Sequence, residues 1–213
     1  MQTFINAYRQ RVTDYYTWSR GSAVPAKVLL CILMACFTGL MAQFRFFLPW
    51  TPVPVTGQTF AVIICGIALG RWGAVSQAIY LLLGLCGVPW FAGAQAGPSA
   101  FLAPTAGYLA GFVAAAYAVG YLYDAHEGCR TFTRQIIVIS AANFILIHGC
   151  GMAFLEIWLF SVKGSPAGLF QLLSMGLFPF LPGDAVKILA AASISTILRP
   201  GSAGGMREDE QER

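Results

Sequence analysis

The sequence predicts an all-α integral membrane protein with six transmembrane helices and with both termini on the cytoplasmic side. Apolar residues make up 57% of its 213 residues and charged residues only 10%, whereas a soluble domain carries about 25% charged residues. The mean hydropathy is +0.67. Backbone polar groups find no partner in lipid, so a chain crosses it as helices or as a closed barrel. The apolar runs are continuous and helix-length, unlike the short alternating segments of a barrel.

Six apolar runs supply the expected spans, because about 20 apolar residues suffice to cross a bilayer. The apolar segment 168–181 is interrupted by Pro179 and followed by Pro182, so we expect an interfacial or partly re-entrant helix there. A seventh span is the weaker alternative, since a few residues around these prolines would have to form the whole turn. The six runs cover residues 28–48, 56–69, 73–88, 105–123, 135–160 and 183–198.

The expected organisation is one membrane domain between two cytoplasmic ends. Segment 1–26 precedes the domain, which covers residues 27–199. The tail 200–213 is polar and is expected to be disordered.

Basic residues set the expected orientation, because they accumulate on the cytoplasmic side of a membrane protein. Only Arg45 and Lys163 fall on the outer side, and Lys187 lies within the membrane. Ten basic residues fall on the cytoplasmic side: Arg9, Arg11, Arg20, Lys27, Arg71, Arg130, Arg134, Arg199, Arg207 and Arg213.

An acidic and a basic residue occur together at the start of the last span. Asp184 and Lys187 are three residues apart, so they share one face of a helix. A charge at the centre of a membrane helix costs roughly 2.5–3.5 kcal/mol on insertion scales, which favours a polar, ligand-binding pocket. The alternatives are a structural ion pair, a Lys187 side chain that reaches the membrane interface, or Asp184 as a helix N-cap.

A ladder of small residues runs along the first span. Cys31, Ala35 and Gly39 recur every four residues, and such faces let helices approach closely. The ladder is either a docking surface for a partner helix or an ordinary packing surface within the bundle.

Single polar residues also interrupt the apolar spans, namely Gln77, Asn143, His148 and Glu156. Hydrogen bonding between helices is their expected role. Asn143 and His148 are five residues apart, and on an α-helix this spacing makes them face different directions.

Common catalytic and metal-binding motifs are absent from the sequence. It contains no G-x-x-x-x-G-K-[ST] phosphate loop, no H-E-x-x-H and no G-x-S-x-G. Its six cysteines form no C-x-x-C pair. The chain is therefore not expected to be an enzyme, and we expect no catalytic residue, cofactor, metal ion or nucleic-acid partner.

Four short motifs follow one another along the chain. They are Pro-Val-Pro-Val-Thr-Gly-Gln-Thr at 52–59, Gly-Val-Pro-Trp-Phe-Ala-Gly at 87–93, Pro-Thr-Ala-Gly-Tyr-Leu-Ala-Gly at 104–111 and Leu-Pro-Gly-Asp-Ala-Val-Lys at 181–187. In order and spacing they resemble the BioY family, the biotin-specific substrate-binding subunits, or S components, of energy-coupling-factor transporters. The resemblance covers roughly residues 27–198.

That resemblance implies a biotin pocket that opens to the outside of a bacterial cytoplasmic membrane. It implies two kinds of partner, a transmembrane coupling subunit and ATPase subunits. It also implies that Asp184 accepts hydrogen bonds from the ureido N–H groups of biotin and that Lys187 attracts the biotin carboxylate. The other pocket residues implied by the matching motifs are Thr56, Gln58, Phe91, Thr105, Gly107 and Tyr108.

The chain departs from the family pattern at residues 93–97, where Gly-Ala-Gln-Ala-Gly replaces a run richer in glycine. The additional methyl groups are expected to stiffen this loop. Gln95 is expected to supply an amide to the pocket.

Two other functions remain open at this stage. The chain could be a self-sufficient, proton-coupled secondary transporter of a small organic acid, with His148 and Glu156 as proton carriers. It could also be a membrane scaffold joined to its neighbours through small-residue faces. Transport that requires a coexpressed ATPase would separate the first function from an energy-coupled one.

Overall fold

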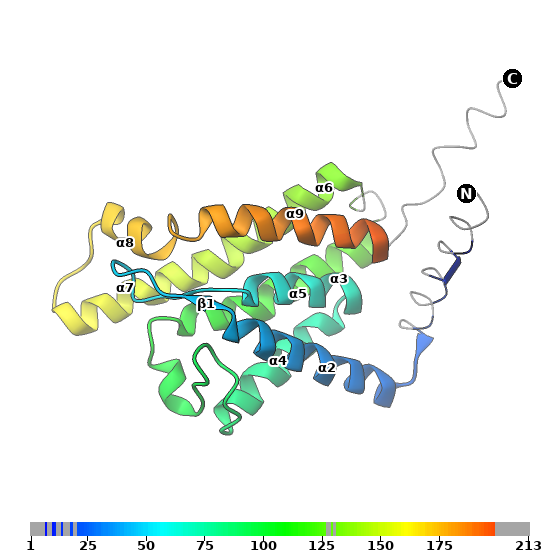
Figure 1. Ribbon diagram of the computed structural model, residues 1–213, viewed down its shortest axis with the longest axis horizontal. Helices are drawn as coiled ribbons and strands as arrows, with labels where there is room; N and C mark the ends of the chain where they lie inside the picture. The colour runs from blue at the N-terminus through cyan, green and yellow to red at the C-terminus, as the bar shows by residue number, and fades with distance from the viewer. Residues whose placement is uncertain are drawn as a thin grey trace, which may run out of the picture.

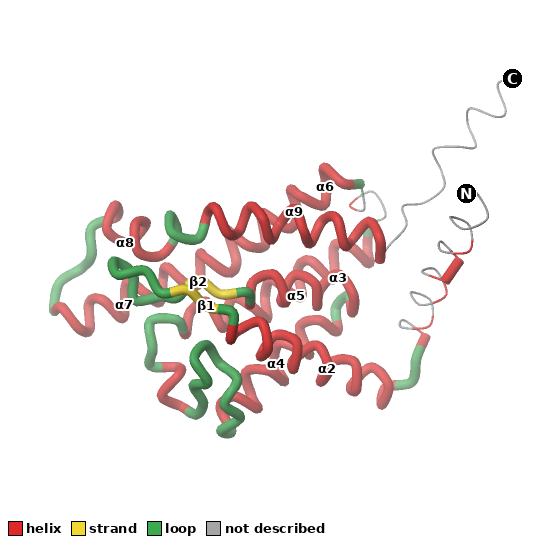
Figure 2. The backbone as a smooth tube through the Cα atoms, viewed as in Figure 1, coloured by secondary structure: helices red, strands yellow, loops and turns green. Residues whose placement is uncertain are grey.

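The computed structural model describes residues 21–126, 129 and 131–198, together with a few earlier positions, Ala7, Gln10, Arg11, Asp14 and Trp18. The expected tail 200–213 lies outside the described residues, and so does most of the expected segment 1–26. Helices form most of the described chain, as expected from the sequence (Figure 2). They are α2 (Val24–Gln43), α3 (Gln58–Leu69), α4 (Trp72–Leu85), η1 (Pro98–Phe101), α5 (Ala106–Ala125), α6 (Phe132–Ala141), η3 (Ala142–His148), α7 (Gly149–Lys163), α8 (Leu169–Gly176) and α9 (Leu181–Leu198).

Helix α5 lies at the centre of the bundle and packs against α3, α4, α7 and η3 (Figure 1). On one side α2 packs against α3 and α4, and on the other α9 packs against α3 and α6. The start of α2 and the end of α9 lie at the same end of the molecule (Figure 1). The opposite end carries α8 and the connection between α2 and α3.

Three helical segments are long and apolar enough to cross a membrane: α2, α5 and the continuous stretch Phe132–Lys163. Helices α8 and α9 form a fourth candidate span that is bent by 50° at the break between them. The apolar helices α3 and α4 contain 12 and 14 residues. At 1.5 Å per residue they are about 18 and 21 Å long, which is shorter than a bilayer core of about 30 Å.

The first expected span extends too far at its C-terminal end. Helix α2 stops at Gln43, and the chain then forms strand β1 (Arg45–Phe46), which pairs in antiparallel fashion with β2 (Val55–Thr56). The Gly57 amide donates to the Met41 and Phe44 carbonyls and so ties the returning strand to the helix end. The segment between the strands contains three prolines, which lack the N–H that a helix requires. This two-stranded hairpin is an exception to the all-α expectation.

The fifth expected span is one continuous helical segment, but its middle is not α-helical. The turn Ala142–His148 is a π-helix, in which hydrogen bonds join residues five apart instead of four. The expectation that Asn143 and His148 face different directions is therefore wrong, because both side chains reach the same partner on α9.

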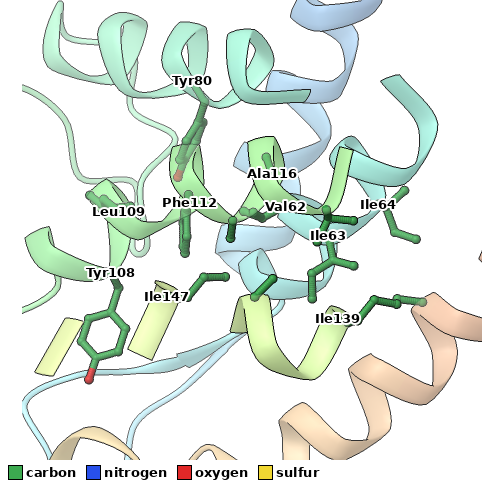
Figure 3. Close-up of a cluster of buried hydrophobic side chains, with 14 of the residues drawn as sticks. Val62, Ile63, Ile64, Tyr80, Tyr108, Leu109, Phe112, Ala116, Ile139 and Ile147 are labelled. Carbon is green, nitrogen blue, oxygen red and sulfur yellow. The ribbon is translucent and has the colours of Figure 1, made fainter. Parts of the chain in front are cut away.

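The core is a continuous apolar cluster between α3, α4, α5 and η3 (Figure 3). Val62, Ile63 and Phe112 are among its members, and none is more than 3% exposed. Close packing is possible because α5 presents Gly111, where a Cβ atom would lie 2.6 Å from the Leu146 carbonyl oxygen. This contact leaves no room for a side chain at position 111, so α5 packs directly against the π-helical turn.

The small-residue ladder of α2 is a packing surface within the bundle. Cys31 and Ala35 are fully buried, and a Cβ atom on Gly39 would lie 3.0 Å from Trp90. Ser76 on α4 donates to the Cys31 carbonyl at 2.9 Å. The suggestion that these residues dock a partner helix is therefore wrong, since α4 and the loop after it already cover them.

Candidate ligand-binding cavity

A cavity opens between the β1–β2 hairpin, the loop 87–105 and the N-terminal halves of α5 and α9. Its empty volume is about 890 Å³ when the open mouth is included. Most of its wall is apolar and comes from side chains such as Val53, Leu109, Phe112 and Phe180. A few polar groups interrupt this wall, which is the usual composition of a site for a small organic molecule.

Seven of the eight residues predicted to bind substrate line this cavity. They come from four separate segments of the chain, so only the fold brings them together. They are Thr56, Gln58, Phe91, Gln95, Thr105, Tyr108 and Lys187. Gly107, which the resemblance also implies, instead faces α7, where a Cβ atom would collide with Cys150 and Phe154.

Asp184, the eighth predicted residue, lies behind the wall and not on it. Its side chain is 1% exposed. One oxygen, Oδ1, accepts from Lys187 at 3.0 Å and from Thr59 at 3.5 Å. The other, Oδ2, accepts from Asn143 at 2.8 Å and lies 2.6 Å from His148 Nε2. Both oxygens are therefore occupied by protein groups, and Asp184 does not line the cavity as the family resemblance implies.

The N-cap alternative for Asp184 is also excluded. Helix α9 begins at Leu181, so Asp184 already lies in its first turn, and its own amide donates to the Phe180 carbonyl at 2.8 Å. A capping carboxylate would instead accept from backbone amides of the first turn. The side chain of Asp184 points across the bundle.

Lys187 reaches the cavity and does not extend to the membrane interface. Its ammonium donates to Thr59 Oγ1 and to Asp184 Oδ1, both at 3.0 Å. A lysine ammonium has three donors, so one remains for a ligand. The neighbouring carboxylate offsets the cost of placing this cation inside the bundle.

His148 completes the support of Asp184 and contributes to the cavity wall. Its Nδ1 lies 3.2 Å from the Gly176 carbonyl, which also accepts from the Tyr108 hydroxyl at 2.8 Å. Figure 3 shows this hydroxyl pointing away from the apolar cluster. Tyr108 and His148 thereby connect the end of α8 to the wall of the cavity.

The π-helical turn explains why the sequence alone did not group these residues. Asn143 and His148 were recognised as polar groups that bond between helices, and they do so. Their common target became visible only once the turn was known, because π bonding brings positions five apart onto one side. Isolated π-turns are often found at functional sites.

The loop 87–105 is held in place by Gln43, at the end of α2. The amide nitrogen of Gln43 donates to the Trp90 and Phe91 carbonyls at 3.2 Å, and its oxygen accepts from the Ala94 amide at 3.2 Å. The Phe91 ring packs over Gly84, where even a methyl group would collide with it. Sequence reasoning did not select Gln43, since a polar residue at a helix end is unremarkable.

Three polar residues of the wall were not predicted to bind ligand, namely Arg45, Thr59 and His148. Thr59 closes the motif at 52–59, and its place in that motif three residues after Thr56 could have suggested it. Arg45 was interpreted only as a charge on the outer side.

The fold and the cavity together define a helical membrane protein that binds a small molecule. A few side chains in fixed positions contact the polar groups of that molecule. Within the described ranges, no group of three or more His, Cys, Asp or Glu side chains could hold a metal ion. The sequence pattern of the BioY family matches residues 13–203. The chain therefore belongs to the BioY family.

Known proteins are similar along most of the chain. The probable biotin transporter BioY of Methanothermobacter thermautotrophicus is 42% identical over 147 residues, which are 68% of this chain and 94% of that protein. The biotin transporter BioY of Rhizobium etli is 29% identical over 80% of this chain and 92% of its own length.

A solved structure shares the fold. It is the crystal structure of the S-component for biotin from an ECF-type ABC transporter, which matches with a TM-score of 0.71. The match has 24% sequence identity and covers 82% of this chain and 90% of that chain.

Proposed function

We propose that this chain is the biotin-binding subunit of an energy-coupling-factor transporter. It captures biotin outside the cell and passes it across the membrane with the help of a transmembrane coupling subunit and ATPase subunits. The observation that carries this proposal is the cavity, whose wall contains six residues that the family motifs imply, together with Gln95. ATP hydrolysis is assigned to the partner subunits, in keeping with the missing phosphate loop.

The chemistry of biotin suits the cavity. Biotin has an apolar ring system and chain, a ureido group with two N–H donors and one carbonyl, and a carboxylate. Phe91, Phe112 and Phe180 offer apolar surface to the ring system and the chain. The free donor of Lys187 is available for the ureido carbonyl, while Thr59 lies beside it.

Asp184 acts on the ligand through its neighbours in this proposal. It fixes the positions of Lys187 and His148, both of which line the cavity. A site whose polar groups are positioned in advance rejects ligands that cannot pair with them, since a buried group left unpaired is costly. Analogues that lack the ureido group should therefore bind poorly.

We further propose that the chain crosses the membrane six times, with α3 and α4 as short spans. The start of α2 and the end of α9 lie at one end of the molecule (Figure 1), which fits an even number of crossings. Basic residues of the sequence concentrate at that end under the six-span interpretation, which supports a cytoplasmic location for it. The hairpin that covers the cavity would then face outward, from the cytoplasmic membrane of a bacterial or archaeal cell.

The experiment that tests the function is a biotin-binding isotherm on the purified full chain in detergent. We expect saturable binding of one biotin per chain, which Lys187→Met should weaken at least tenfold, as the loss of a hydrogen bond to a charged group predicts. Lys163→Met is the matched control, because Lys163 is an exposed cation at the end of α7. Absence of biotin binding by the unmodified chain would refute the proposal.

The alternative of a proton-coupled transporter gains no support from the positions of its two carriers. His148 bonds to Asp184, whereas Glu156 accepts from the Ala167 amide at 3.0 Å in the connection before α8 and does not line the cavity. Uptake by vesicles that contain this chain alone, driven by a pH gradient, would favour that alternative.

A further inference from the structure

Two cations line the cavity, and they differ in their electrostatic partners. Lys187 is paired with the buried carboxylate of Asp184. The side chain of Arg45, on strand β1, has no ion pair or hydrogen bond to any residue in the described part of the chain, and its guanidinium lies 5.2 Å from the centre of the Phe47 ring. The wall thus carries one uncompensated positive charge, and it belongs to Arg45.

The surroundings of Arg45 are built to hold it at the mouth of the cavity. Arg45 pairs with Thr56 in the hairpin, and Thr56, Arg45 and Phe47 all line the cavity. Across the mouth, the guanidinium rests against Gly93, where any Cβ atom would collide with it. Gly93 also has a φ of +82°, a conformation that glycine adopts without strain. The loop 87–105 therefore leaves room for this one side chain.

We propose that Arg45 binds the carboxylate of the ligand and so determines that the cavity selects an anion. This inference rests on the proposed function and orients biotin in the cavity. The ureido ring lies against Lys187 and Thr59, and the carboxylate, at the other end of the molecule, meets Arg45. The family resemblance implies that Lys187 attracts the carboxylate. Here the carboxylate is assigned instead to Arg45, the cation whose charge is not already neutralised.

The chemistry of the two side chains supports this division. A guanidinium presents paired N–H donors that match the two oxygens of a carboxylate. A lysine that already shares its charge with an aspartate attracts a second carboxylate weakly, because that carboxylate would also be repelled by the first. Arg45 is exposed to solvent, so its charge is partly screened until the ligand covers it.

The test compares biotin with biotin methyl ester, which keeps the rings and the chain but has no charge. Binding isotherms of both would be recorded in low salt for the unmodified full chain, Arg45→Gln, Arg45→Lys and the control Lys163→Gln. We expect the unmodified chain and the control to prefer biotin by at least tenfold, in line with a charge-assisted hydrogen bond. Arg45→Gln should lose this preference while its affinity for the ester changes less than threefold, and Arg45→Lys should keep part of it.

Retained affinity for the ester also shows that the variant is folded. A preference for biotin that persists in Arg45→Gln would overturn the assignment of Arg45 and leave the proposed function intact. An equal loss of affinity for biotin and for the ester in Arg45→Gln would likewise overturn the assignment, because it would show that Arg45 acts by shaping the loop. Failure of the unmodified chain to bind either compound would instead overturn the proposed function and this inference together.

Discussion

His148 Nε2 lies 2.6 Å from Asp184 Oδ2, although His148 ends the π-helical turn and Asp184 lies in the first turn of α9. Both side chains are 1% exposed. This contact joins the fifth and the last apolar runs of the sequence behind the cavity wall. It makes Asp184 the centre of a buried polar cluster that also contains Asn143, Thr59 and Lys187.

Substituting Asp184→Asn should reduce both stability and biotin binding. The change keeps the size of the side chain but leaves Lys187 without a negative charge. Removing one partner of a buried ion pair costs about 3–5 kcal/mol, so we expect a large drop in the midpoint of thermal unfolding in detergent. Biotin affinity should fall at least tenfold because Lys187 loses its fixed position. An unfolding midpoint equal to that of the unmodified chain would contradict the account of the cluster.

Removing both charges together should restore stability without restoring function. In Asp184→Leu with Lys187→Met, no buried charge remains unpaired, and apolar replacements of buried ion pairs are often neutral or stabilising. We expect the double variant to be more stable than Asp184→Leu alone, with a coupling energy above about 1 kcal/mol in the double-mutant cycle. Biotin should not bind to it. Strictly additive effects of the two substitutions would show that the ion pair is not energetically coupled.

A methyl group at Gly84 should weaken binding by displacing an aromatic side chain of the cavity. The Cβ atom of Gly84→Ala would collide with the Phe91 ring, which also packs edge-on against Tyr80 at 5.3 Å. We expect at least a tenfold loss of biotin affinity, because a displaced ring takes space from the ligand. The control is Gly168→Ala, where no atom lies within 4 Å of the added methyl group. Equal affinities of the two variants would contradict the placement of Phe91.

Ala94→Gly should stabilise the chain. Ala94 has a φ of +56°, and a left-handed conformation costs a residue with a Cβ atom roughly 1–2 kcal/mol. Glycine removes this strain but adds freedom to the unfolded chain, so we expect a net gain of about 0.5–1 kcal/mol. Thermal unfolding of the variant would measure it. A lower midpoint than that of the unmodified chain would show that the methyl group contributes packing that outweighs the strain.

Much of the site could be predicted from the sequence because its residues lie in short motifs. The proline-rich motif supplied Thr56 and Gln58, and the motif that begins the fourth run supplied Thr105 and Tyr108. Helix-length apolar runs likewise predicted the positions of most helices, since lipid requires backbone bonding within each helix.

The remaining features depend on contacts that no single segment contains. Helix α2 ends at Gln43 because a distant loop and the hairpin bond to its last turn. The hydrogen-bonding pattern of the π-turn, and with it the common direction of Asn143 and His148, cannot be read from residue spacing alone. The small residues of α2 could serve either interpretation, and only the position of α4 decided between them.

Biotin is expected to occupy the cavity beside Lys187, and the roles proposed for the other lining residues depend on this position. A crystal structure of the full chain grown with biotin would test it most directly. We predict that the bicyclic ring lies between Phe91 and Phe180, with its ureido carbonyl within hydrogen-bond distance of Lys187 Nζ. Biotin bound at another place on the chain, with this cavity holding only solvent, would contradict the account.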